Sequence, residues 1–142
     1  MQISSRFTIA VHILVCIDVF KNQYKLTSDF LAGSVNVNPV IIRKILSQLK
    51  ASGLVDIVRG SGGANLAKPL DEITFLDVYH SVECVDDEGL FHFHEHPNPE
   101  CPVGKNIHSS LDEKLQRVQS AMEKELSKIK ISDVSEDIQN YL

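Results

Sequence analysis

The segment from Thr27 to Asn65 constrains the fold most strongly, because its residue pattern alternates between helix formers and turn formers in a defined order. The predicted elements are a helix over Thr27–Val35, a turn over Asn36–Pro39, a helix over Val40–Ser52, a strand over Leu54–Val58 and a glycine-rich loop over Arg59–Asn65. This order predicts a winged helix-turn-helix. In that fold one helix can enter the major groove of B-DNA, and the hairpin can reach the neighbouring backbone or the minor groove.

The second of these helices is predicted to have one buried face and one basic face. Asn38 followed by Pro39 is typical of a helix start. Apolar residues at helical spacing form the predicted inner face: Ile42, Ile45, Leu46 and Leu49. The opposite face is polar and basic, as a groove-entering helix requires, although an ordinary solvated helix has the same pattern.

Candidate DNA contacts lie on that basic face, at the starts of both helices and in the glycine-rich loop. Arg43 could distinguish guanine through two hydrogen bonds, and Arg59 with the loop backbone would contact phosphates or the minor groove. The full candidate set is Thr27, Asn38, Val40, Arg43, Lys44, Ser47, Arg59, Gly60, Ser61, Gly62, Gly63 and Asn65. The expected partner is double-stranded DNA.

The charge distribution is compatible with this partner, although the net charge of the 142 residues is −5. Residues 1–69 carry eight Lys and Arg against three Asp and Glu, a net of +5, whereas residues 70–142 carry six against sixteen, a net of −10. Electrostatic attraction to phosphate is screened over roughly 8–10 Å, so the local charge matters more than the total. Random variation in surface charge is the alternative interpretation.

The flanking segments are predicted to be helical. Ile3 to about Phe20 has apolar residues at helical spacing, and Thr74 can cap a helix from Phe75 to about Val82. Residues 85–104 have an irregular pattern. A long helix follows, and its single apolar stripe is better explained by pairing with a second copy than by folding back onto the first helix. The predicted dimer contacts are Ile107, Leu111, Leu115, Val118, Met122 and Leu126.

Several motifs in these segments resemble the Rrf2 family of bacterial winged-helix regulators, which includes an iron–sulfur cluster regulator, a nitric-oxide-sensitive repressor and a cysteine-metabolism repressor. The matching motifs, within about residues 1–130, are Ser4–Phe7 with Ala10, Asn38–Ile45, Gly53–Val55, Arg59–Ala64 and Ile73–Tyr79. The resemblance implies a dimeric transcription factor whose long C-terminal helices pair. It also implies that the loop before that helix senses a signal.

Cysteine usage departs from the cluster-binding members, which carry three closely spaced cysteines in this loop. The present loop has Cys101, with Cys84 seventeen residues earlier. A two-iron cluster needs about four ligands, so no iron–sulfur cluster is expected. Redox sensing through Cys101, alone or paired across the dimer, is the leading hypothesis for the effector, with Cys84 as a second candidate sensor, and a thiol without sensory function is the alternative. Cys16 is expected to be a packing residue.

Three histidines alternate with other residues in the same loop. If the loop were an extended strand, His92, His94 and His96 would share a face and could bind zinc or copper, with Cys101 as a fourth ligand. Phenylalanines that pack while histidines face water would give the same alternation. A metal ion is therefore possible, and no other cofactor is expected.

Other function classes receive little support. The glycine loop lacks the Lys-Ser/Thr ending of a phosphate-binding loop, and no nucleophile elbow or paired carboxylates indicate an enzyme. The apolar run Phe7–Phe20 is too short to span a membrane and lacks the features of a signal peptide. The odd count of three cysteines favours a reducing cytoplasm.

The sequence therefore predicts a mainly α fold with a small two-stranded β wing. The expected organisation is a winged helix-turn-helix domain over residues 1–83, a sensor loop over 84–103, and a dimerisation helix with its tail over 104–142. The expected function is a cytoplasmic, dimeric transcriptional regulator, acting as a repressor at a pseudo-palindromic operator. A winged-helix adaptor that binds proteins without DNA is the alternative.

Overall fold

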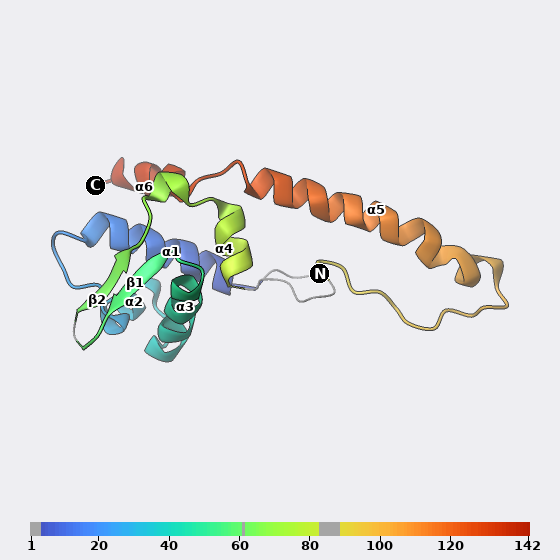
Figure 1. Cartoon of the computed structure of the whole chain (residues 1–142), viewed down its shortest axis with the longest axis horizontal. Helices are drawn as coiled ribbons and strands as arrows, with labels where there is room; N and C mark the ends of the chain where they lie inside the picture. The colour runs from blue at the N-terminus through green and yellow to red at the C-terminus, as the bar shows by residue number, and fades with distance from the viewer. Residues whose placement is uncertain (1–3, 61, 83–88) are drawn as a thin grey trace.

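The computed structural model describes residues 4–60, 62–82 and 89–142. Within them the chain is mostly helical with one two-stranded antiparallel sheet, as predicted (Figure 1). The elements are α1 (Arg6–Phe20), α2 (Ser28–Val35), α3 (Pro39–Ala51), β1 (Val55–Val58), β2 (Gly63–Leu66), a 3-10 turn η1 (Leu70–Glu72), α4 (Phe75–Ser81), α5 (Pro102–Leu126) and α6 (Ile131–Gln139).

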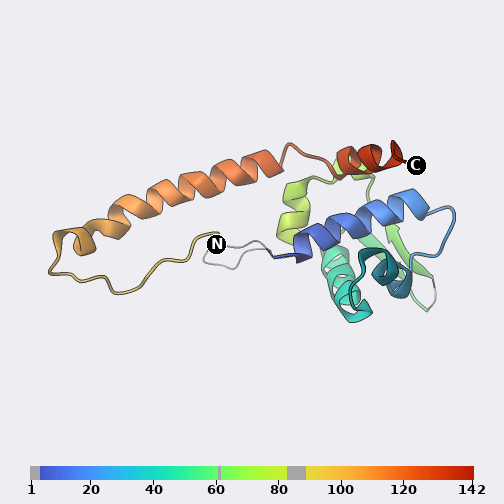
Figure 2. The same cartoon turned by 180° about the vertical axis from the view of Figure 1, so that it is seen from behind.

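Helix α1 is the centre of the core. Its residues Ala10, Ile13, Leu14 and Ile17 have no exposed surface, and the helix contacts α2, α3, α4, α6 and β2. Because it is covered from several sides, apolar residues occur around most of its circumference rather than on one stripe. Both views place α2, α3 and the hairpin on the side of α1 opposite α6 (Figures 1 and 2).

The helix-turn-helix forms where the sequence predicts it. Thr27 caps α2 by accepting a hydrogen bond from the Phe30 N–H at 3.1 Å, and Asn38 caps α3 by accepting one from the Val40 N–H at 2.8 Å. Between the helices Asn36 has a left-handed backbone with φ of 64°, which ends α2 and turns the chain. Helix α3 begins at Pro39, one residue before the predicted start, because Pro suits the first helical position.

The wing is a hairpin in which β1 pairs with β2 from Val55↔Leu66 to Val58↔Gly63. The predicted loop over Arg59–Asn65 is too long, since β2 begins at Gly63. A Cβ at Gly63 would lie 2.8 Å from the Leu26 backbone, and the neighbouring Ala64 N–H donates to the Leu26 carbonyl at 2.9 Å. Close backbone approach therefore fixes the start of β2, at the tip end of the hairpin, beside the start of α2.

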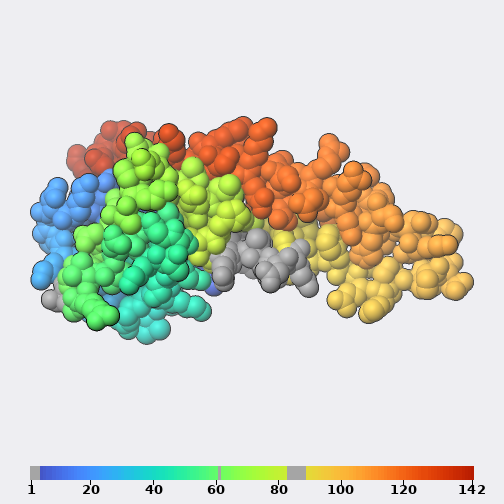
Figure 3. Space-filling view, in the orientation of Figure 1, coloured from blue at the N-terminus to red at the C-terminus, as the bar shows by residue number. Residues whose placement is uncertain are grey.

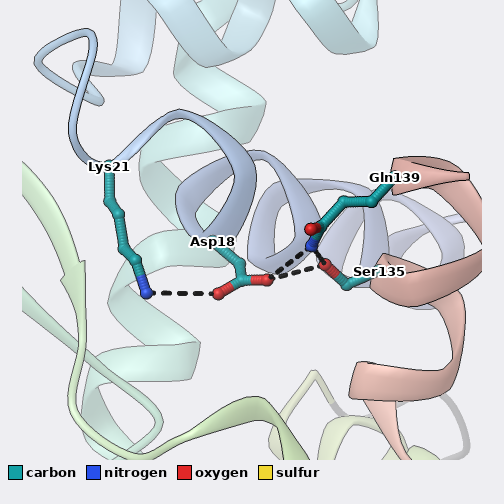
Figure 4. A network of polar contacts seen from close by, with 4 residues as sticks. All are labelled: Asp18, Lys21, Ser135 and Gln139. Carbon is teal, nitrogen blue, oxygen red and sulfur yellow. Dashed lines mark hydrogen bonds and ion pairs between the residues drawn. The ribbon is translucent and has the colours of Figure 1, made fainter. Parts of the chain in front are cut away.

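Helix α6 was not predicted, since the sequence pattern gave only a tail after the long helix. Ile131 is fully buried in the core beside α1, and Ser135 of α6 donates a hydrogen bond of 2.6 Å to Asp18 of α1. Gln139 donates to the Ser135 hydroxyl at 3.0 Å, and Lys21 lies 3.4 Å from the other Asp18 oxygen (Figure 4). The C-terminal segment thus folds back onto the first helix.

The turn between α5 and α6 is joined to the start of α4. The Phe75 N–H donates to the Ile129 carbonyl at 2.8 Å, and the Ile131 N–H donates to the Ile73 carbonyl at 2.9 Å. Thr74 and Lys130 form the bridge between these two bonds, while Thr74 and Asp77 form the predicted helix cap. The end of α5 is consequently held against α4.

Helix α5 and the loop before it project from the rest of the molecule as an arm, defined here as residues 89–126 (Figures 1 and 3). The loop returns along α5: the Leu90 N–H donates to the Gln119 side chain at 2.9 Å, and a Cβ at Gly104 would lie 2.5 Å from the Asn98 carbonyl. No residue of α5 is fully buried in this single chain. Among the described residues, no helix is both long enough and apolar enough to cross a membrane.

Candidate nucleic-acid interface

Helix α3 exposes the face that the sequence predicts as a reading surface. Ile42, Ile45, Leu46 and Leu49 point into the core. The exposed residues are Val40, Ile41, Arg43, Lys44, Ser47 and Lys50. Val40 and Ile41 are 61% and 42% exposed at the start of the helix, where apolar side chains could contact thymine methyl groups. The exposed face therefore combines cations, a hydroxyl and apolar contacts.

A groove of about 310 Å³ separates α3 from the wing. Of the predicted DNA contacts it is lined by Thr27, Arg43, Ser47, Gly60 and Gly63. Arg43 lies at its edge, where one guanidinium nitrogen donates to the Ser28 hydroxyl at 3.4 Å. The structure thus brings the first turn of α2, the exposed face of α3 and the wing around one hollow.

The wing tip exposes Arg59 and turns at Gly60, whose φ of 78° is in the left-handed region. Gly62 leaves no room for a side chain, because a Cβ there would lie 2.2 Å from a Val58 methyl group. The predicted contact Ser61 lies outside the described residues. A tip of this kind presents backbone N–H groups and one cation, which suits phosphate contacts.

Three predicted contacts have different surroundings from those that the sequence pattern indicated. The side-chain oxygens of Thr27 and Asn38 already accept the capping bonds of α2 and α3, so Thr27 retains a hydroxyl donor and Asn38 its amide donors. Asn65 pairs with Asp56 in the hairpin and lines a separate hollow with Asp18 and Lys21. It faces away from the groove because alternate strand residues point to opposite faces.

Two residues that the prediction omitted belong to this surface. Ser28 lines the groove and orients Arg43, and Ile41 is exposed beside Val40. Ser28 could have been found from its position directly after the capping Thr27, since the first turn of a helix offers free N–H groups. Ile41 carried no such signal, because an isoleucine beside Ile42 is ordinarily counted with the core.

The histidine loop is not an extended strand, which corrects the premise of the metal prediction. His96 has φ of 58°, and this left-handed residue breaks the alternation that would align His92, His94 and His96. His94 lies instead beside His108 of α5, with ring centroids 5.3 Å apart, and His108 contacts Asp112 at 3.1 Å. In residues 4–60, 62–82 and 89–142, no three His, Cys, Asp or Glu side chains are placed to hold a metal ion.

The cysteines have contrasting surroundings. Cys101 precedes α5, and the backbone N–H groups of Gly104 and Val103 hold the pKa of its thiol below the usual value. Burial raises the pKa of Cys16, and a hydrogen bond with Ser34 opposes that effect. Cys84 lies outside the described residues. Only Cys101 of the two described thiols combines access with stabilisation of the thiolate.

The predicted dimer residues follow one side of the arm. Ile107, Leu111 and Leu115 are partly buried by the neighbouring loop and helix surface, and Val118 is 50% exposed. Met122 and Leu126, nearer the core, pack against its edge. Within one chain Val118 is therefore half exposed, and the other residues of this apolar stripe are only partly covered.

Comparison with known proteins places these features in one family. Residues 3–137 match the family model of Rrf2, described as an iron-dependent transcriptional regulator. YwnA of Bacillus subtilis (strain 168), provisionally described as an HTH-type transcriptional regulator, is 43% identical over 133 residues, which are 94% of this chain and 96% of YwnA. The resemblance read from the motifs is thereby confirmed.

Solved structures show the same fold. A crystal structure described provisionally as a DNA-binding protein is 37% identical, with a TM-score of 0.71, and the match covers 92% of this chain and 98% of that one. CymR of B. subtilis, described as the global cysteine regulator, is 20% identical with a TM-score of 0.68, covering 96% of this chain and 97% of CymR. At that identity, the likeness to CymR concerns the fold alone.

Proposed function

Because the chain belongs to the Rrf2 family of transcriptional regulators, we propose that it is a dimeric repressor that reads a pseudo-palindromic operator. The groove between α3 and the wing carries this proposal, since it places Arg43, Ser47 and the tip glycine Gly60 around one hollow. A helix that meets base edges and a hairpin that meets the backbone would together fix the protein on B-DNA.

Recognition would proceed from the start of α3. Val40 and Ile41 would contact thymine methyl groups, and Arg43 would leave Ser28 to form two hydrogen bonds with guanine. Lys44 and the wing residue Arg59 would neutralise phosphates on either side. Backbone contacts would set the position of the protein, and the α3 residues would select the sequence.

Dimerisation would supply the second reading helix. The apolar stripe of α5 would offer Val118, which is half exposed, and the partly covered Leu111 and Leu115 to the same surface of a second copy. A two-fold dimer presents two identical reading helices, which is why such proteins bind two half-sites related by the same symmetry. A dimer bound at the operator would block access of the transcription machinery and so repress the adjacent gene.

We also propose that Cys101 senses thiol-reactive oxidants. Its lowered pKa favours the thiolate, which is the form that oxidants attack, and it lies where the loop meets α5. Iron is not part of this proposal: the described residues offer no group of metal ligands, so they do not fit an iron site.

The salt dependence of DNA binding tests the proposed function. Affinity for a duplex selected from a random pool should fall linearly with log[salt], with a slope of about −0.9 for each phosphate neutralised. Arg59→Ala should make this slope less negative by about one for each copy that contacts DNA. A protein adaptor that does not bind DNA would show no measurable affinity for any duplex at about 50 mM salt, and that result would overturn the proposal.

A further inference from the structure

Helix α6 carries two adjacent stripes of side chains that meet α1 in different ways. Ile131, Ser135 and Gln139 make the docking contacts described above (Figure 4). The second stripe, Val134 and Ile138, has the same spacing of four residues and lines a hollow at the edge of the core, against which Val134 also packs. Ile138 remains 43% exposed.

The opposite wall of this hollow is a stripe of α1 formed by Val11, Val15 and Val19. These residues recur every four positions and therefore share one side of the helix. The hollow between the two stripes, which we call the α1–α6 cleft, has a volume of about 340 Å³. For comparison, an apolar cavity of about 150 Å³ can hold benzene, so the cleft has room for a body of about two fused rings.

The chemistry of the lining favours an uncharged ligand. Most of the lining residues are aliphatic, and none carries an Asp, Glu, Lys or Arg side chain. A charged ligand would lose its hydration among these aliphatic side chains, and no Asp, Glu, Lys or Arg side chain is there to offset that loss. An apolar ligand would release water from the aliphatic surface of both helices, and that release is favourable.

One edge of the cleft is polar. The Ser34 hydroxyl of α2 lies 2.9 Å from His12 Nε2 and 3.2 Å from the sulfur of Cys16. A hydroxyl can both donate and accept, and imidazole also has one nitrogen of each kind when neutral. This edge could therefore exchange a hydrogen bond with a ligand hydroxyl, as small-molecule sites with few polar groups commonly do.

We propose that the α1–α6 cleft is a binding site for a small uncharged molecule with an apolar body of about two rings and one hydroxyl group. The molecule lies between Val15 and Val134, with its hydroxyl toward Ser34. Its walls come from α1 and α6, with Ser34 of α2 at one edge. This ligand site goes beyond the proposed DNA-binding function, and binding to it can be measured without DNA.

The test measures binding of 2-naphthol to the full chain. Binding is detected by titration calorimetry and by changes in the amide NMR resonances of the protein. Saturable binding of one molecule per chain is expected, with resonance changes concentrated in α1, α6 and the end of α2. Val134→Phe fills the cleft and should abolish binding. Val103→Phe makes the same enlargement at a residue that is 68% exposed on α5, and it should leave binding unchanged.

Two further comparisons examine the polar edge. Ser34→Ala should weaken binding of 2-naphthol by about three- to tenfold and leave binding of naphthalene unchanged, because only the hydroxyl loses its partner. Ser109→Ala, at an exposed serine of α5, is the matched control. 2-Naphthalenesulfonate should bind at least about tenfold more weakly than 2-naphthol, as expected for a charged group in this lining.

The proposal is overturned if 2-naphthol shows no saturable binding at about 1 mM, or if Val134→Phe leaves its binding unchanged. Equal affinity for the sulfonate would also overturn it, since the lining would then not select uncharged molecules. A change of sedimentation mass in Val134→Phe, without any naphthol binding to the parent chain, would show instead that a second copy covers the cleft.

Discussion

Two of the residues proposed to contact DNA already have a structural role in the same side-chain atoms. Thr27 and Asn38 cap the two helices of the reading unit with the oxygens that a DNA contact would otherwise use. Arg43 is different, because its bond to the Ser28 hydroxyl is 3.4 Å long and exposed to solvent. A long exposed bond of this kind has a small net free energy, so the guanidinium can move to a base at little cost.

Arg43→Ala should therefore change specificity more than general affinity. We expect a loss of about 1–3 kcal/mol in discrimination at one base position of each half-site, because the bidentate pair to guanine is removed. Affinities for a set of single-base operator variants measure this. Lys44→Ala removes a proposed phosphate contact on the same exposed face and should weaken all variants alike. The base-reading role of Arg43 would be refuted if its variant behaved like the Lys44 variant.

Cys101 gives a pH-dependent prediction. Because nearby backbone N–H groups lower its pKa, its thiolate forms at lower pH than that of a free thiol, and its reactivity should rise earlier with pH. Alkylation by iodoacetamide, followed at each cysteine by peptide mass spectrometry, should give a midpoint for Cys101 below that of free cysteine. Cys16 should react slowly throughout, since burial raises its pKa. A Cys101 midpoint at or above the free-thiol value would contradict this.

At the same scale, the sequence predicts which α3 residues face outward but not what else surrounds them. The spacing of Ile42, Ile45 and Leu49 is sufficient to orient α3, because helical periodicity is a local property. The separation of Asn65 from Arg43 depends on the hairpin register, which arises from contacts between distant segments. Local patterns do not contain that information.

Among the elements, α6 shows why a short helix escapes prediction. Its nine residues include Ile131, Val134 and Ile138 at helical spacing, but isolated helices of this length are marginal in water. What stabilises α6 is tertiary: Ile131 enters the core, and Ser135 bonds to Asp18, which lies more than a hundred positions earlier. Helices α2, α3 and α4 were predictable because their capping residues directly precede them in the sequence.

Ile131→Ala should destabilise the whole fold. The side chain is fully buried where α6 meets the segment before α4, so its truncation should cost about 2–5 kcal/mol in the free energy of unfolding. Urea denaturation followed by circular dichroism measures the change. Ile138→Ala makes the same truncation at a half-exposed position of the same helix and should cost less than about 1 kcal/mol. Equal costs would show that α6 does not belong to the core.

The whole molecule consists of a packed body, made by the winged helix and α6, and an arm that leaves it (Figure 3). The sequence predicted the long helix from its single apolar stripe. It did not predict that the chain returns to the body after Leu126, because the bridge between Thr74 and Lys130 joins segments far apart in sequence. The expected domain boundary at residue 83 therefore remains a prediction. It assigned α6 to the dimerisation segment, whereas α6 packs against α1 of the body.

Leu115→Lys should separate the proposed dimer. A lysine in the middle of the apolar stripe would place two like charges against apolar side chains of the partner, which is strongly unfavourable. Light scattering after gel filtration should change from dimer to monomer mass while the helical content is kept. Gln116→Lys adds the same charge at the adjacent exposed position and should remain dimeric. If both variants kept the parent mass, α5 would not be the dimer contact.

The pairing of Ile73–Phe75 with Ile129–Ile131 has a consequence for how proteins of this fold can evolve. The arm follows α4 along the chain, and after the arm the chain returns beside the start of α4, so the arm is an excursion next to one short helix. Exposed excursions anchored in this way tolerate insertions and exchanges better than the elements they join. A new signal-responsive arm could therefore be acquired without rebuilding the DNA-reading body, and one reading unit could serve many different signals.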